Sequence, residues 1–255
     1  MPHPGDRVHV ARLLPEPAGF QSPALSSDDR LVAYGRRDPS GRSVVVVGNP
    51  ERPDAIVEPR VVGFRGTAAV AWRPGAAQLA IQHSATPSAQ PHGPVDLLDV
   101  VNGDVRRLSD DFVLASFWSP DGRYLATLSL VGGDDDRTVV ASAWPDAAAA
   151  LQTPVPTPLA RRVQARTTAL ALKVIDVDSG AVRPLGVFTP SPLFLLQYLP
   201  FCDQYARSHR LWSPASDTLV LPALDGDGVP TLVFFGVDGE ARPLVVGDGP
   251  TWNVR

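Results

Sequence analysis

One phrase of nine residues recurs four times along this chain of 255 residues. Each copy places a large apolar residue before two polar or proline residues, a tight turn and an apolar strand. The copies begin at Leu25, Trp72, Trp118 and Trp212, at intervals of 47, 46 and 94 residues. A period in the forties is typical of stacked supersecondary units, each of which buries its apolar faces against its neighbours. The repeat therefore constrains the architecture more than any single residue does.

Each copy of the phrase predicts two antiparallel strands and the hairpin between them. In the third copy, Ser119-Pro120-Asp121-Gly122 supplies a proline with a fixed φ and a permissive glycine, and Tyr124–Leu128 leaves as the second strand. A weaker signal follows in the unit: an apolar run, a two-residue turn and a short strand. Such turns occur at Asn102-Gly103, Ser179-Gly180 and Asp238-Gly239. They suit the hairpin turns that need positive φ, so we expect four antiparallel strands in each unit.

A four-stranded sheet cannot bury both of its faces alone, and stacking such sheets around an axis solves the problem. We therefore predict an all-β fold, a β-propeller of four-stranded antiparallel blades, as one domain over residues 1–255. The blades are expected at about 20–63, 64–111, 112–187 and 188–246, and residues 247–255 begin a further blade.

The two chain ends complete this prediction. Trp252 stands where the next unit's tryptophan is expected, and Arg7–Leu13 reads as an isolated strand before the first unit. We expect four full blades plus a partial fifth formed from the chain ends. The alternative is an incomplete or open propeller, which would self-associate through its exposed blade edge.

The spacing of the phrase also exposes two insertions. The first, residues 132–166, contains Asp134–Asp136 and a proline-rich stretch, and is expected to be a solvated excursion or, alternatively, a lid or docking arm. The second, residues 188–210, has too many apolar and aromatic residues for an exposed loop without a partner. It either lengthens the strand entering the fourth blade and caps the core, or forms a partner-binding surface. The candidate partner-binding residues are Phe194, Tyr198, Phe201, Asp203, Tyr205, Arg207 and His209.

Composition excludes several classes of partner. The formal charge is −4 and the arginines are scattered, so no concentrated basic face is expected for a nucleic acid. No segment has the roughly 18 uninterrupted apolar residues needed to cross a bilayer, so we expect no membrane insertion. The start of the chain lacks the features of a secretory signal, which predicts a soluble, cytoplasmic protein; a truncated N-terminus would instead allow the periplasm. Cys202 is the only cysteine, so no intrachain disulfide can form.

No motif in the sequence predicts catalysis or a bound cofactor. Gly-x-Ser-x-Gly does not occur, and the five histidines include no His-x-x-x-His pair and no cysteine neighbour. Asp225–Gly228 lacks the distal glutamate of an EF-hand and is interpreted as a hairpin turn. We therefore expect no catalytic residue, no metal site and no cofactor.

At the level of the repeat, the chain resembles a known family. Trp118–Ala126, followed in the same unit by Val174–Gly180, is similar to the WD40-like (PD40) blade of bacterial TolB-type propellers and of the propeller domains of prolyl-oligopeptidase-type peptidases. The likeness runs from about Phe20 to Trp252. It is specific for the blade and not for a function, because the same blade is shared among scaffolds, peptidase gating domains and sensory proteins. A whole TolB protein would add a signal sequence and a small α/β domain.

Two functions are compatible with these observations. The repeat and the apolar second insertion favour a non-catalytic β-propeller that acts as a protein or peptide interaction scaffold. The alternative is a detached propeller, substrate-gating or ligand-sensing, of a prolyl-oligopeptidase-type or periplasmic TolB-like system. Charged side chains converging on the central channel would favour the alternative, and an exposed aromatic patch beside residues 192–210 would favour the scaffold.

Overall fold

The computed structural model describes residues 23–37, 43–49, 52–57, 66–84, 90–131, 168–206, 209–239 and 241–244. In this part of the chain the protein is mostly β-strand with antiparallel pairing and very little helix, which confirms the predicted all-β class. The first insertion and both chain ends, including Arg7–Leu13 and Trp252, lie outside the described residues.

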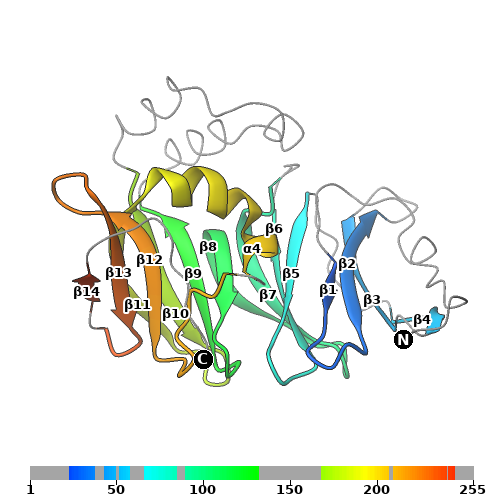
Figure 1. Ribbon diagram of the computed structural model, residues 1–255. Helices are drawn as coiled ribbons and strands as arrows, with labels where there is room; N and C mark the ends of the chain where they lie inside the picture. Colours follow the sequence, from blue (N-terminus) through cyan, green and yellow to red (C-terminus); the bar gives the residue numbers. More distant parts are fainter. Residues whose placement is uncertain are drawn as a thin grey trace, which may run out of the picture.

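The strands follow one another in space in the order of the sequence. A four-stranded sheet holds β1 (Ala24–Leu25), β2 (Val32–Arg37), β3 (Ser43–Asn49) and β4 (Arg52–Val57). A ten-stranded sheet holds β5 (Ala68–Trp72), β6 (Gln78–His83), β7 (Gly93–Asp99), β8 (Val105–Trp118), β9 (Tyr124–Leu130), β10 (Leu170–Asp176), β11 (Val182–Pro190), β12 (Thr218–Leu224), β13 (Pro230–Gly236) and β14 (Ala241–Leu244). Figure 1 shows the strands of successive repeats standing side by side, from blue to red.

Two long strands join neighbouring repeats. Strand β8 pairs with β7 along Val105–Ser109 and again at Val113, and with β9 along Val113–Trp118. Strand β11 pairs with β10 along Val182–Phe188, and with β12 only through Thr189–Pro190. The outer strand of one repeat therefore runs directly into the innermost strand of the next. For this reason the ten strands form one continuous hydrogen-bonded sheet, whereas the sequence predicted separate blades.

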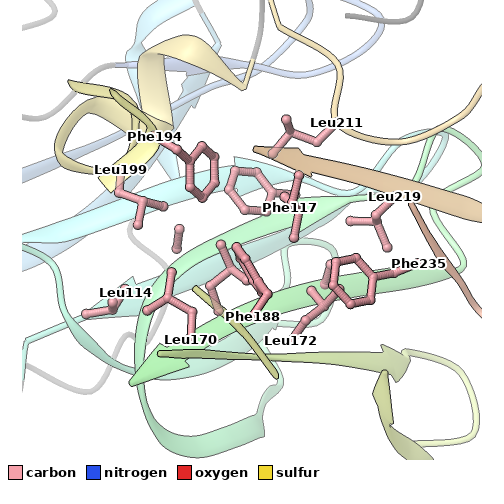
Figure 2. Close-up of a cluster of buried hydrophobic side chains, with 14 of the residues drawn as sticks. Leu114, Phe117, Leu170, Leu172, Phe188, Phe194, Leu199, Leu211, Leu219 and Phe235 are labelled. Carbon is pink, nitrogen blue, oxygen red and sulfur yellow. The ribbon is translucent and has the colours of Figure 1, made fainter. Parts of the chain in front are cut away.

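The apolar core lies between adjacent repeats. The largest cluster, between the third and fourth repeats, contains Leu170 and Leu172 from β10, and Leu219 and Phe235 from β12 and β13 (Figure 2). A second cluster joins the first repeat to the second, and a third joins the second repeat to the third. Because an apolar cluster joins each repeat to the next, the repeats depend on one another for stability.

Candidate functional site

The repeated phrase forms a hairpin turn that is closed by its own side chains. In the third copy the Ser119 hydroxyl donates to Asp121 Oδ1 (2.6 Å) and accepts the N–H of Tyr124 (2.9 Å). Gly122 has a φ of 72°, in the left-handed region that favours glycine. The first copy places Ser26 and Asp28 in the same way, at 2.7 Å. Serine and aspartate in the phrase are therefore turn-forming residues.

The tryptophans of the phrase link one repeat to the one before it. Their indole Nε1 atoms donate to backbone carbonyls: Trp72 to Ala24 (2.8 Å), Trp118 to Ala71 (3.1 Å) and Trp212 to Phe117 (3.2 Å). Each acceptor is the residue immediately before the first residue of the preceding copy. This spacing places the innermost strands of the four repeats next to one another.

The second insertion interrupts the innermost strand of the fourth repeat. The N–H of Ser191 donates to the Pro222 carbonyl on β12 (3.1 Å), and the N–H of Val220 donates to the Leu211 carbonyl (2.8 Å). The chain thus leaves β12 at Ser191 and returns to it two positions further along, at Leu211. Between these two points, the described residues 192–206 and 209–210 project from the end of the sheet.

Part of this insertion caps the core. It folds into three short helical turns, η2 (Phe194–Tyr198), η3 (Leu199–Phe201) and α4 (Cys202–Tyr205), which lie across the ends of the strands (Figure 1). Phe194 is 2% exposed and Leu199 1% exposed, and both pack into the largest cluster (Figure 2). Phe194, predicted as a partner contact, is therefore a packing residue.

The other aromatic residues of the insertion form one stack. The Tyr198 ring lies 5.1 Å from the Phe194 ring and 5.4 Å from the Tyr205 ring, centroid to centroid. His209 meets Tyr205 edge-on at 5.5 Å, and Phe201 meets it edge-on at 6.3 Å. Tyr205 is 37% exposed and ends the stack at the surface. The structure thus brings five of the seven predicted residues together.

A cavity of about 630 Å³ lies between this insertion and the innermost strands. Every repeat contributes to its wall: the lining includes Leu25, Ala69, Ala71, Trp72, Phe117, Trp118 and Trp212. The insertion adds Cys202, Asp203, Ala206, His209 and Arg210. In β5 the alternation of side chains points Ala68, Val70 and Trp72 toward the first repeat, and small Ala69 and Ala71 leave room on the other face.

The charged groups at the cavity all come from the insertion. Among the described residues that line it, the strands contribute apolar side chains, Gln82 and serines, and the ionisable groups are Cys202, Asp203, His209 and Arg210. Two of the predicted contacts, Asp203 and His209, therefore lie at this cavity, and Arg207 lies outside the described residues. The arrangement is an apolar chamber with a mixed-charge edge, which suits an apolar group carried by a polar chain or ligand.

Burial makes the thiol and the phenol at this site poor reactants. Burial first, and then the neighbouring Asp203 carboxylate, raises the pKa of Cys202 to about 12. Burial also raises the pKa of Tyr198 above its usual range. Both groups stay protonated near neutral pH, so Cys202 offers no thiolate nucleophile.

A second polar cluster lies away from the cavity, between β6, β7 and β8. Asp96 accepts from His83 Nε2 at 2.9 Å and from Arg107 Nε at 2.5 Å. Burial raises the pKa of Asp96, but these hydrogen bonds and the arginine charge outweigh it, and the pKa is lowered overall. The cluster joins three neighbouring strands and is a structural ion-pair network.

The described residues offer no cation site and no membrane span. Asp225 Oδ1 accepts the N–H groups of Asp227 (2.9 Å) and Val229 (2.8 Å), as in a side-chain-closed turn. In the part of the chain that the structure describes, no three acidic, histidine or cysteine side chains are placed to hold a metal ion. Within the same residues, no helix is long and apolar enough to cross a membrane.

No family model matches the chain, and no curated protein is significantly similar to it. Solved structures do match. An oligogalacturonate lyase in complex with manganese is 14% identical, with a TM-score of 0.50 over 88% of this chain and 52% of the lyase. TolB from Acinetobacter baumannii is 14% identical, with a TM-score of 0.48 over 92% of this chain and 45% of TolB.

A third match is the β-propeller domain of the Trilobed protease from Pyrococcus furiosus, described as having an open velcro topology. It is 12% identical, with a TM-score of 0.47 over 90% of this chain and 58% of that domain's chain. The chain thus spans about half the length of these proteins. At such identities the likeness concerns the fold alone. The matched proteins include TolB-like and propeller-domain proteins, each at 12% to 14% identity and with a TM-score below 0.5.

The sequence did not reveal the cavity. Its walls consist of alanines and of residues of the repeated phrase, such as Trp72, Trp118 and Trp212, and the phrase by itself does not indicate a cavity. The one available signal was the alternation in Ala68-Ala69-Val70-Ala71-Trp72, where small residues occupy one face of an innermost strand. That pattern shows room on one face but not what lies opposite.

Proposed function

We propose that this chain is a non-catalytic binding module of the β-propeller type, which holds a peptide segment of a partner protein in the cavity beneath the second insertion. The observation that carries the proposal is the convergence of all four repeats and the insertion on one apolar chamber of about 630 Å³. A chamber of this size suits one or two large apolar side chains of a peptide. The exposed Tyr205, at the edge of the stack, supplies an aromatic contact for the chain that carries them.

We also propose that the repeats are the blades of a propeller. Each repeat is taken as one blade, the long strands β8 and β11 connect successive blades, and the chain ends supply a partial fifth blade. The tryptophan-to-carbonyl links between consecutive repeats support this interpretation, because they repeat one geometry between each pair of neighbours. Stacking of this kind around an axis places the innermost strands at a common channel.

The chemistry of the chamber supports binding without catalysis. The Cys202 thiol is held protonated, with a pKa of about 12. The strand walls bring no acid, base or metal-binding pair among the described residues.

The rival function is a ligand-sensing or substrate-gating propeller that binds a small charged molecule. The grouping of Asp203, His209 and Arg210 at the edge of the chamber favours it. The two functions differ in which side chains hold the ligand: the apolar strand wall for a peptide, and the charged edge for a small ion.

Selection of binding peptides from a display library, with the full chain as bait, tests the proposal. Fluorescence anisotropy would then give the affinity of a selected peptide for each variant. Ala71→Trp fills the chamber from β5 and should weaken binding by at least tenfold, and Tyr205→Ala should weaken it less. Val187→Trp, on a β11 residue that is 60% exposed and does not line the chamber, is the matched control and should bind normally.

The outcomes separate the two functions. Full affinity in a folded Ala71→Trp variant would reject the chamber as the peptide site. Failure to select any peptide, together with thermal stabilisation by a small anion or cation that Asp203→Asn or Arg210→Ala abolishes, would establish the rival.

A further inference from the structure

The innermost strand of the second repeat, β5, has one edge that pairs with no strand among the described residues. It ends the ten-stranded sheet, with β6 on its other side. The N–H of Ser84 donates to the Thr67 carbonyl (3.1 Å), and the N–H of Arg73 donates to the Gln78 carbonyl (2.8 Å). In an antiparallel ladder, hydrogen-bonded pairs alternate with pairs that are not bonded. The odd-numbered residues of β5 therefore bond to β6, and the even-numbered residues point their main-chain groups toward the free edge.

At this free edge, Val70 and Trp72 each present one N–H and one carbonyl. In the part of the chain that the structure describes, these main-chain groups have no hydrogen-bond partner. Both residues line the chamber, so the edge opens into it. Unpaired main-chain groups at the edge of a sheet are a template for a further strand.

The innermost strands of the other repeats are less suited to accept a strand. Strand β1 has only two residues, and the fourth repeat contributes a single bridge at Trp212. Strand β8 carries Phe117 where β5 carries Ala71, at the position just before the phrase tryptophan. In β5, small Ala69 and Ala71 line the chamber beside the free edge. Among the described innermost strands, β5 therefore combines a regular free edge with space next to it.

An extended peptide matches this edge in both donors and acceptors. Residues two apart are separated by about 7 Å along a strand, and a second strand presents its own N–H and carbonyl groups at the same spacing. In antiparallel pairing, one peptide residue exchanges two hydrogen bonds with Val70 and another does so with Trp72. The strand walls of the chamber carry no charged side chain among the described residues, so the peptide side chains that enter it are uncharged.

We infer that the partner's peptide segment binds as an extended strand antiparallel to β5, with main-chain hydrogen bonds to Val70 and Trp72 and with apolar side chains at every second position. Those side chains lie over Ala69 and Ala71, on the face of β5 that has room. In this mode the main chain supplies affinity and the alternate side chains supply specificity. The inference rests on the proposed function, because it requires a peptide in the chamber.

Two scans of the peptide selected from the display library test the inference on the wild-type full chain. N-methylation of one residue at a time removes a main-chain donor, and substitution by alanine removes a side chain. In antiparallel pairing, a peptide residue that bonds to the edge turns its side chain away from the face of Ala69 and Ala71. N-methylation should therefore weaken binding about tenfold at every second residue, and alanine should weaken it at the residues between.

The scans separate failure of this inference from failure of the proposed function. If Ala71→Trp weakens binding but N-methylation is tolerated at every position, the peptide occupies the chamber without adding a strand, and only the inference fails. Sensitivity to both changes at the same residues overturns the antiparallel pairing. If no peptide is selected, or if a folded Ala71→Trp variant binds normally, the proposed function fails as well.

Hydrogen exchange shows which edge the peptide uses. The selected peptide should slow exchange of the Val70 and Trp72 amides about tenfold and leave those of Leu25 and Ser116 unchanged, although all four residues line the chamber. Protection at Ser116 instead would place the peptide on β8 and overturn the inference. Protection of Val70 and Trp72 in the free protein would show that this chain or a second copy already holds the edge, which also overturns it.

A proline substitution supplies a matching change in the protein. Val70→Pro removes the N–H at the free edge and no hydrogen bond to β6, and proline is accepted at such edge positions. Binding should weaken about tenfold. Leu25→Pro is the control at the equivalent outward position of β1 and should leave binding unchanged. Full affinity in a folded Val70→Pro variant would overturn the inference, and the peptide scans on the wild-type chain decide it if that variant does not fold.

Discussion

The indole of Trp118 donates to the carbonyl of Ala71, the residue that precedes Trp72, across the boundary between two repeats. Trp118→Phe keeps most of the packing and removes this donor, so we expect the free energy of unfolding to fall by about 1 kcal/mol. Urea unfolding measures it, and Trp72→Phe and Trp212→Phe should behave alike because their geometry is the same. If all three variants are as stable as the wild type, the indole bonds contribute nothing to the contact between repeats.

Gly122 is constrained both by its positive φ and by a close neighbour, whereas Gly180 is constrained by its positive φ alone. Both have positive φ, at 72° and 74°, but a Cβ at Gly122 would lie 2.5 Å from the Pro74 carbonyl oxygen, whereas a Cβ at Gly180 meets nothing within 4 Å. Gly180→Ala should cost about 1 kcal/mol of stability, the usual penalty for an alanine in the left-handed region. Gly122→Ala should cost clearly more, because the turn of the second repeat must move. Equal losses in thermal or urea unfolding would contradict the close approach of the two turns.

Asp121, the turn aspartate of the third repeat, makes the free energy of unfolding depend on pH. Burial raises the pKa of Asp121, but hydrogen bonds from Ser119, the Arg123 backbone and Ser216 outweigh it and lower the pKa below its ordinary value of 3.8. A lowered pKa in the folded state contributes stability that is complete above that ordinary value and is lost as the pH falls below it. Ser119→Ala removes a donor, so its destabilisation should be largest near pH 7 and shrink below about pH 4.

Unfolding in urea at several pH values between 7 and 3 measures this dependence. Ser129→Ala is the control, because that hydroxyl is buried with no hydrogen-bond partner among the described residues. Its effect on stability should be small and independent of pH. A Ser119→Ala loss that stays constant down to pH 3 would show that the hydrogen bond does not act through the Asp121 charge.

Cys202 lines the chamber but should react slowly. Its side chain is buried, with a pKa of about 12, so only a minute fraction is thiolate at pH 8. We expect a thiol reagent such as DTNB to label the native protein far more slowly than the urea-unfolded chain. Asp203→Asn removes the adjacent negative charge and should speed native labelling modestly. Immediate stoichiometric labelling of the native protein would show that the thiol is accessible and ionised.

The local features of the fold could be predicted from the sequence because they depend on interactions between residues a few positions apart. The turn at Ser119–Gly122 follows from a serine, a proline, an aspartate and a glycine at fixed offsets, and the structure shows the hydrogen bonds that those residues are suited to make. The two long strands were not predicted, since the periodicity marks turns and does not say whether the residues between two units stay extended.

Only part of the candidate site could be predicted from the sequence. The excess of apolar residues in 188–210 indicated a segment that needs a partner, and the structure shows that part of that partner is the protein's own core: Phe194 and Leu199 are buried there, while Tyr205 reaches the surface. Composition cannot distinguish a side chain that packs into the core from one that reaches the surface, because both roles use aromatic side chains in a short stretch.

By itself the sequence determined the all-β class, the turns and the order of the repeats, because hydrophobic alternation and turn residues act over a few positions along the chain. The tertiary structure alone decided that the indole of Trp118 meets Ala71, that residues 192–210 leave and rejoin a single strand, and that a chamber forms beneath them. These features arise from contacts between residues tens of positions apart, whose distances depend on how whole sheets pack against one another.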